Sequence, residues 1–133
     1  MTFEDLEAWK SARMLVRGIY KLTRQDGLCR DFGLCSQVQR SGVSVMSNVA
    51  EGFERLHLPE KLQFYNVARA STGETRSLLY VIEDNYPEAA ATAVALRAEA
   101  IAVGKLVSGL IQSTENRKSK MAKILSSLFA SFC

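Results

Sequence analysis

The sequence predicts an all-α fold, an antiparallel up-down four-helix bundle, on the strength of three observations. Apolar residues recur at helical spacing through most of the 133 residues, and Pro59 and Pro87 are the only prolines. The segment between Gly27 and Gly33 separates the first periodic stretch from the second. The length suits one domain with a core of its own. The expected helices span residues 4–25, 34–56, 60–84 and 88–112.

Composition and charge restrict the class of protein. Hydrophobic residues make up 47% of the chain and charged residues 23%, which is usual for a soluble globular protein and excludes collagen-like or disordered chains. No run approaches the ~18 apolar residues of a membrane span, and the first residues carry acid where a signal peptide would be basic. The three cysteines, Cys29, Cys35 and Cys133, lack metal-ligand spacing. We therefore expect reduced thiols and a cytoplasmic location.

The net charge of +3 is concentrated at the C-terminal end. We expect residues 1–112 to form the bundle and residues 113–133 to form a basic, amphipathic tail. Its apolar residues stand at helical spacing: Met121, Ile124, Leu125, Leu128, Phe129 and Phe132. Such a tail could dock on a neighbouring copy, fill a partner's groove, lie on a membrane surface or fray. Docking on the protein's own oligomer is the interpretation we favour.

The helix expected over residues 4–25 has an apolar face and a basic face opposite it. The apolar face holds Ala8, Ala12, Leu15, Val16, Ile19 and Leu22. The opposite face, the basic stripe, holds Lys10, Arg13, Arg17, Lys21 and Arg24. Such a stripe is typical of a solvated face, but five regularly spaced cations could also follow the phosphates of a nucleic acid.

A narrow polar stripe runs along the otherwise apolar helix expected over residues 34–56. Its members are Gln37, Arg40, Ser44, Asn48, Glu51 and Arg55. A helix this apolar is expected to be buried on most sides, so its polar groups need partners. We interpret the polar stripe as a hydrogen-bonded layer within the bundle. A subunit interface and a water-filled channel are the alternatives.

The helix expected over residues 60–84 presents two faces. The core face is predicted to hold Phe64, Val67, Ala68, Ser71, Leu78 and Ile82. A second face, with Leu62 at its edge, is predicted to hold Tyr65, Arg69, Arg76 and Tyr80. Alternating aromatic and guanidinium groups could stack bases and bind phosphates, or could form a protein interface.

In the helix expected over residues 88–112, we expect Leu96, Val103, Val107 and Leu110 to face inward. Val94 and Ile101 fall on the other side, which indicates that this outer face is covered in an oligomer.

Catalytic and metal-binding patterns are largely missing from the sequence. Glu54 and His57 have the Glu-x-x-His spacing of di-iron bundles, but such a site needs two of these motifs, and His57 is the only histidine. We place His57 at a helix end or in a loop. No glycine-rich phosphate loop occurs, and the glycines at 42, 52 and 73 are expected to serve close helix packing or helix ends. We expect no catalytic residues, no metal and no cofactor, and a protein that is not an enzyme.

The residues themselves resemble a known family. The opening run FEDLEAWK (residues 3–10), the run QVQRSGVSVMSNVAEGFER (residues 37–55) and the run ARAS (residues 68–71) with Glu74 carry the likeness. The chain is similar to the bacterial four-helix-bundle proteins encoded in 23S rRNA intervening sequences, over roughly residues 1–112. Ala70 stands where the family usually has glycine, and Gly42 where it usually has alanine. The tail is outside the family pattern.

The resemblance implies an antiparallel bundle that assembles as a ring-like homopentamer. It extends to the accessory proteins of diversity-generating retroelements, basic pentamers that associate with a reverse transcriptase and nucleic acid. The family has no assigned reaction. Its motif positions coincide here with Gln37, Arg40, Ser44, Asn48, Glu51, Gly52, Arg55, Ser71 and Glu74. We interpret Arg40, Asn48, Glu51 and Glu74 as a buried or interfacial polar network that fixes helix register.

Together these features predict a homo-oligomeric, RNA-associated adaptor without enzymatic activity. The expected phosphate contacts are Lys10, Arg13, Arg17, Lys21, Arg24, Arg69 and Arg76. Because such contacts read phosphates and not bases, we expect binding with little sequence specificity and a strong dependence on salt. The alternative is a scaffold with no nucleic-acid role, whose protein partner occupies the Tyr65–Tyr80 face or the tail.

Overall fold

Four α-helices account for most of the residues described, 1–132, in a computed structural model. They are α1 (Glu7–Leu22), α2 (Phe32–Glu54), α3 (Leu58–Asn85) and α4 (Ala90–Phe132). Single turns of 3₁₀ helix at Phe3–Asp5, Leu28–Arg30 and Pro87–Ala89 precede α1, α2 and α4. The predicted all-α class and helix order are confirmed.

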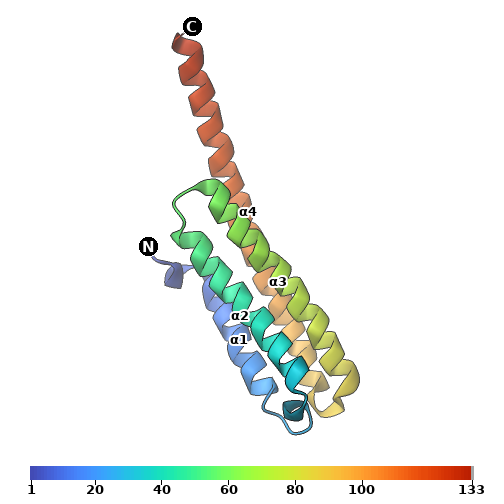
Figure 1. Ribbon diagram of the computed structural model, residues 1–133. Coiled ribbons are helices and arrows are strands. Elements are labelled where there is room, and N and C mark those ends of the chain that lie inside the picture. Colours follow the sequence, from blue (N-terminus) through green and yellow to red (C-terminus); the bar gives the residue numbers. More distant parts are fainter. Residues whose placement is uncertain (133) are drawn as a thin grey trace.

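The helices pack in sequence order, consistent with an up-down bundle (Figure 1). Helix α1 packs on α2, α2 on α3 and α3 on α4, and α4 closes the bundle against α1. This order places α1 diagonally across from α3. The closest packing is that of α3 against its two neighbours, α2 and α4.

The two connections at the lower end of the bundle are tied together by Asp31. One carboxylate oxygen of Asp31 caps α2 by accepting from the backbone N–H of Leu34 at 3.2 Å. The other accepts from the Tyr86 hydroxyl at 2.7 Å, between α3 and α4. This hydrogen bond raises the pKa of Tyr86 above its ordinary value. In the same loop as Asp31, Gly27 has a φ of 83°, which favours glycine.

The core consists of aliphatic side chains from all four helices, as the periodicity predicts. The fully buried large side chains include Leu15, Ile19 and Leu22 of α1, Val38, Val45 and Val49 of α2, Leu79 and Ile82 of α3, and Val103 and Val107 of α4. Five of the six residues predicted for the α1 core face are buried, and Val16 is half-buried.

The predicted faces of α3 need correction. Tyr65, expected on the outer face, is only 3% exposed, whereas Val67, expected in the core, is 45% exposed. The buried face follows spacings of three and four residues through Tyr65, Ala68, Ser71, Thr72, Thr75, Leu79 and Ile82. Two threonines on this face look polar in sequence, but Thr75 donates to the carbonyl of Ser71 at 2.8 Å and Thr72 to that of Arg69 at 2.6 Å. Their hydroxyls are satisfied locally, so burial costs little.

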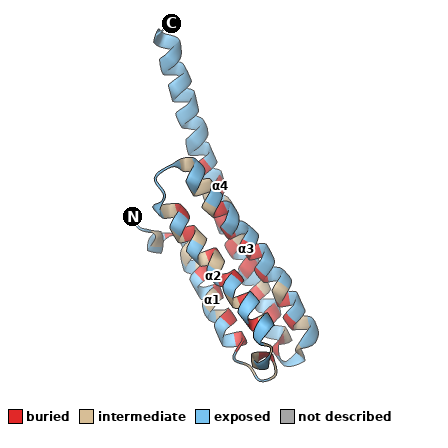
Figure 2. Cartoon of the chain, in the orientation of Figure 1, coloured by how far each residue is buried: buried red, intermediate tan, exposed pale blue. Residues whose placement is uncertain are grey.

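Helix α4 passes the expected boundary at residue 112 without a break. Thr114 is its last buried residue, and every described side chain from 115 onward is exposed (Figure 2). No glycine or proline follows Gly109, so nothing in the local sequence ends the helix. The outer half of α4, residues 115–132, therefore projects beyond the bundle, and we name it the α4 extension (Figure 1).

Close packing at Gly52 generates a first prediction. A Cβ at this position would lie 2.6 Å from Cε1 of the buried Tyr65, whereas a Cβ at Gly73 would meet nothing within 4 Å. We expect Gly52→Ala to lower the free energy of unfolding by about 1–3 kcal/mol through overpacking. The matched control, Gly73→Ala, should raise it by about 0.5–1 kcal/mol through helix propensity. Urea titrations followed by circular dichroism measure both, and equal effects would contradict the packing role of Gly52.

Candidate nucleic-acid interface

The basic stripe lies on the outer side of α1. Lys10, Arg13, Arg17 and Lys21 belong to the helix, Arg24 follows its end, and all five are exposed. From Lys10 to Lys21 the stripe covers about 16 Å at 1.5 Å per residue. The opposite face of α1 supplies the core, so the cations are held on a rigid element and point away from the bundle.

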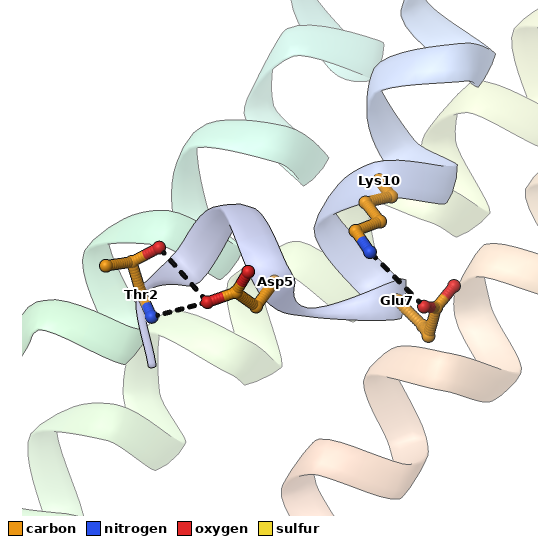
Figure 3. Close-up of polar contacts among 4 residues, drawn as sticks. All are labelled: Thr2, Asp5, Glu7 and Lys10. Carbon is orange, nitrogen blue, oxygen red and sulfur yellow. Dashed lines mark hydrogen bonds and ion pairs between the residues drawn. The ribbon is translucent and has the colours of Figure 1, made fainter.

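Few acidic groups neutralise the basic stripe. Lys10 lies 3.6 Å from the Glu7 carboxylate, in an exposed pair one helical turn apart (Figure 3). Arg13 stacks over the Trp9 ring with 5.7 Å between its guanidinium carbon and the ring centre. Within residues 1–132, the other three stripe cations form no ion pair with a carboxylate. Exposed pairs are weak, so the stripe stays available to an anionic ligand.

A local cap holds the 3₁₀ turn Phe3–Asp5, which precedes α1. The backbone N–H of Thr2 donates to the Asp5 carboxylate at 2.9 Å, and the Thr2 hydroxyl donates to the same oxygen at 3.4 Å (Figure 3). These bonds hold the pKa of Asp5 below its ordinary value, with the backbone bond the larger cause. Phe3 packs edge-on against Trp9 at 5.2 Å, which steadies the ring on which Arg13 stacks.

Arg69 and Arg76 lie on a different surface from the basic stripe. They border a groove of about 650 Å³ between α3 and α4, floored by small residues that include Ala70, Gly73 and Gly104. Because α3 is diagonal to α1, this groove does not continue the basic stripe. The seven predicted phosphate contacts thus form two surfaces. Lys105 adds a third cation to the groove, which becomes visible only when α3 and α4 are placed side by side.

The structure leaves little of the predicted Tyr65–Tyr80 face available. Tyr65 lies in the core, and burial raises the pKa of its hydroxyl. Tyr80 is exposed, but the Arg97 guanidinium lies over its ring at 3.8 Å. Arg97 is held there by an ion pair with Glu83. The two tyrosines therefore do not form a common platform for bases or for a partner.

Part of the α2 polar stripe forms hydrogen bonds between α2 and α3. The hydroxyls of Ser44 and Ser71 lie 2.8 Å apart. The amide of Asn48 donates to the carbonyl of Ser44 at 2.8 Å and to its hydroxyl at 3.1 Å. One turn away, the hydroxyl oxygens of Thr75 and Ser41 lie 2.8 Å apart. The sequence analysis did not identify the last pair, because only the packing of α3 on α2 brings these two hydroxyls together.

The remaining polar-network residues face outward. Gln37, Arg40, Glu51, Arg55 and Glu74 are all exposed. Arg55 stacks on the Phe64 ring at 4.6 Å. In the described part of the chain, Arg40, Glu51 and Glu74 form no side-chain hydrogen bond or ion pair. The prediction that these three are buried within the bundle is therefore wrong, because α2 turns the edge with Arg40 and Glu51 to solvent and α3 does the same with Glu74. Their role at an interface between copies stays a prediction.

Other reactive groups serve the fold. Burial raises the pKa of the Cys35 thiol, whose sulfur lies 3.2 Å from the carbonyl of Leu28. His57 is the exposed residue before α3, as expected of a helix end. Among residues 1–132, no cluster of three or more His, Cys, Asp or Glu side chains could hold a metal ion. None of the helices described is both long and apolar enough to cross a membrane.

The Ser41–Thr75 hydrogen bond can be tested with an isosteric change. Thr75→Val keeps the shape of the side chain but removes the hydroxyl that links α3 to α2. We expect a loss of about 1 kcal/mol in the free energy of unfolding. Thr92→Val, at an exposed position of α4, is the control and should change stability far less. Urea midpoints measure the difference, and equal midpoints would show that the bond contributes nothing.

The interface role of the polar network can be tested at Glu51. Since Glu51 has no partner within the described chain, Glu51→Ala should act through contacts between copies. We expect a smaller oligomer or a lower melting temperature, read by light scattering and calorimetry. The control is Glu99→Ala, at an exposed position of α4. If Glu51→Ala changes neither quantity, the network hypothesis fails.

Comparison with known proteins identifies the family of the chain that carries these surfaces. The model of the 23S rRNA-intervening sequence protein family matches residues 4–109. The matched region contains the basic stripe, the α2 polar stripe and both arginines of the α3–α4 groove, and it stops before the α4 extension. A search of the curated proteins finds no match. Since the family match covers most of the chain, this protein belongs to the 23S rRNA-intervening sequence protein family.

Proposed function

We propose that this protein is a cytoplasmic, homo-oligomeric adaptor that binds RNA through phosphate contacts and catalyses no reaction. The observation that carries the proposal is the basic stripe, five exposed cations on one side of α1. Such a row attracts a polyanion by releasing its counterions. The rigid helix fixes the spacing of the cations, so the conformational entropy that the protein loses on binding comes mainly from their side chains.

The chemistry of the stripe suits phosphates better than bases. Lysine and arginine side chains on an open, convex helix face reach backbone oxygens of any sequence. The aromatic side chains that could have stacked bases are already engaged, Tyr65 in the core and Tyr80 under Arg97. The adaptor therefore binds structured RNA with little sequence preference.

The oligomer would multiply these contacts. The resemblance to the family implies a ring-like homopentamer, and a ring repeats the basic stripe on every copy. Several weak sites on one assembly bind a long polyanion far more tightly than one site does. The α3–α4 groove, with Arg69, Arg76 and Lys105 at its edges, offers each copy a second anionic contact.

A salt titration tests the proposal. Purified protein is added to a labelled structured RNA, and fluorescence anisotropy is followed at ~50 and ~200 mM salt. Binding through several phosphates predicts that affinity falls by about 10³-fold or more between these conditions for six or more contacts. Absence of binding at ~50 mM salt would show that the basic stripe is only a solvated face with no RNA-binding role. It would favour the alternative, a scaffold for a protein partner.

Charge reversal locates the contact. Arg13→Glu with Arg17→Glu should abolish RNA binding, because it places two anions in the middle of the basic stripe. The control, Arg30→Glu with Lys120→Glu, makes the same change in net charge at exposed positions outside the basic stripe and the α2 polar stripe. It should retain most of the affinity. Equal losses in the two variants would show attraction to the whole protein and contradict a defined stripe.

A further inference from the structure

The α4 extension carries a large apolar surface that no other part of residues 1–132 covers. Residues 115–132 are helical and exposed, over a length of about 27 Å (Figures 1 and 2). Its exposed apolar side chains are Met121, Ile124, Leu125, Leu128, Phe129 and Phe132. The polar side of the extension is occupied by serines and by lysines such as Lys120 and Lys123. From Met121 onward the helix thus has an apolar and a polar side, which is typical of a helix that is covered on one side.

The apolar side of the extension continues the bundle-facing side of α4. Residues 18 apart on an α-helix are separated by about five full turns and point in the same direction. Leu125 thus points in the direction of Val107, Phe129 in that of Ile111, and Met121 in that of Val103. All three of the inner residues are buried. The apolar face with which α4 packs on its neighbours therefore continues past the end of the bundle. We name its outer part, formed by Met121, Leu125, Leu128 and Phe132, the apolar seam.

This direction restricts what can cover the extension. Helices α1 and α3 pack on the same side of α4 as the apolar seam. A flat surface such as a bilayer, laid against the seam, would meet the end of the bundle. A narrow element such as another helix fits in line with the bundle.

The seam is complementary to itself when reversed. Met121, Leu125, Leu128 and Phe132 follow spacings of four, three and four residues. A two-fold axis between Ser126 and Ser127 sets Met121 opposite Phe132 of a second copy and Leu125 opposite Leu128. Every seam residue thus meets a large apolar residue, while Ile124 and Phe129 flank the seam. Self-complementarity of this kind is the requirement for a two-fold interface between identical chains.

The charges favour the same orientation. In a parallel pair, Lys118 at the base of the seam would face Lys118 of the other copy, and like charges side by side are destabilising. In the antiparallel pair the two Lys118 side chains are about 25 Å apart along the axis. Lys123 then lies level with Ala130, so no seam position brings two cations together.

From this geometry we propose that the α4 extensions of two copies pair antiparallel and cover each other's apolar seam. However many copies the bundle surfaces hold together, this contact joins such assemblies two by two. It uses residues beyond the family match and does not depend on RNA binding.

Oligomer mass tests the proposal directly. Leu125→Asp places a charge in the seam, while Ser127→Asp places the same charge on the polar side of the same stretch. Light scattering should show the mass of the full-length protein halved by Leu125→Asp and unchanged by Ser127→Asp. Both sites lie outside the bundle, so equal melting temperatures by circular dichroism show that the bundle stays folded. An unchanged mass for Leu125→Asp would overturn the proposal.

Cross-linking tests the orientation. Single variants Met121→Cys and Phe132→Cys are made with Cys29→Ser and Cys133→Ser, which leaves only the buried Cys35. Co-expressed with different tags, the two variants should be joined by a cross-linker shorter than about 10 Å. Met121→Cys alone should give no cross-link, because its two copies are about 16 Å apart along the axis. Efficient cross-linking of Met121→Cys to itself would overturn the antiparallel arrangement.

A membrane outcome is also distinguishable. The protein is floated with vesicles of phosphatidylcholine containing phosphatidylserine. We expect it to stay with the soluble fraction. Flotation that is lost in Leu125→Asp but retained in Ser127→Asp would overturn the proposal and assign the seam to an anionic bilayer.

Discussion

The tight contact between α2 and α3 is the constraint on which the rest of the bundle depends. Gly52 lets the Tyr65 ring lie against the backbone of α2, and hydroxyl pairs such as Ser41–Thr75 link the two helices farther along. Small residues bring the helix axes close, and the hydroxyl contacts between the helices favour this register, since a slip of one turn would separate Ser44 from Ser71 and Ser41 from Thr75. With α2 and α3 set in this way, α1 and α4 close the bundle from the other side.

That arrangement decides which surfaces the chain presents. Tyr65 is drawn into the core to fill the space at Gly52, so α3 loses one of the two aromatic groups that could have received a ligand. Its two groove arginines then lie beside α4, while the basic stripe of α1 lies diagonally across the bundle. An RNA held by both surfaces has to pass around the bundle or between copies, which is why oligomer geometry matters to the proposed function.

Sequence periodicity predicts much of this fold, and its failures have definite physical causes. The family, the helix order, the α1 faces and the end position of His57 follow from spacing, prolines and motifs. The core face predicted for α3 is rotated about the helix axis relative to the observed face. Thr72 and Thr75 look polar in the sequence because their hydrogen bonds to the preceding turn are unknown there. The engagement of Tyr80 by Arg97, and the joining of Lys105 to the groove, depend on neighbours from another helix. Exposure of Arg40, Glu51 and Glu74 likewise depends on which edges of α2 and α3 stay uncovered.

Helix α4 links the two proposals physically. Its inner half closes the bundle that carries the basic stripe, and its outer half extends the same apolar seam into the space beyond. Pairing of two extensions would fix two bundles at opposite ends of a short rigid rod, each with its own stripe. Since a rigid link raises the effective concentration of a second site only when its length matches the spacing of the ligand, such a rod would favour RNA long enough to reach both ends. Because α4 is one continuous helix, pairing of its outer halves would fix the distance between two basic stripes. The protein would then bind long polyanions in preference to short ones.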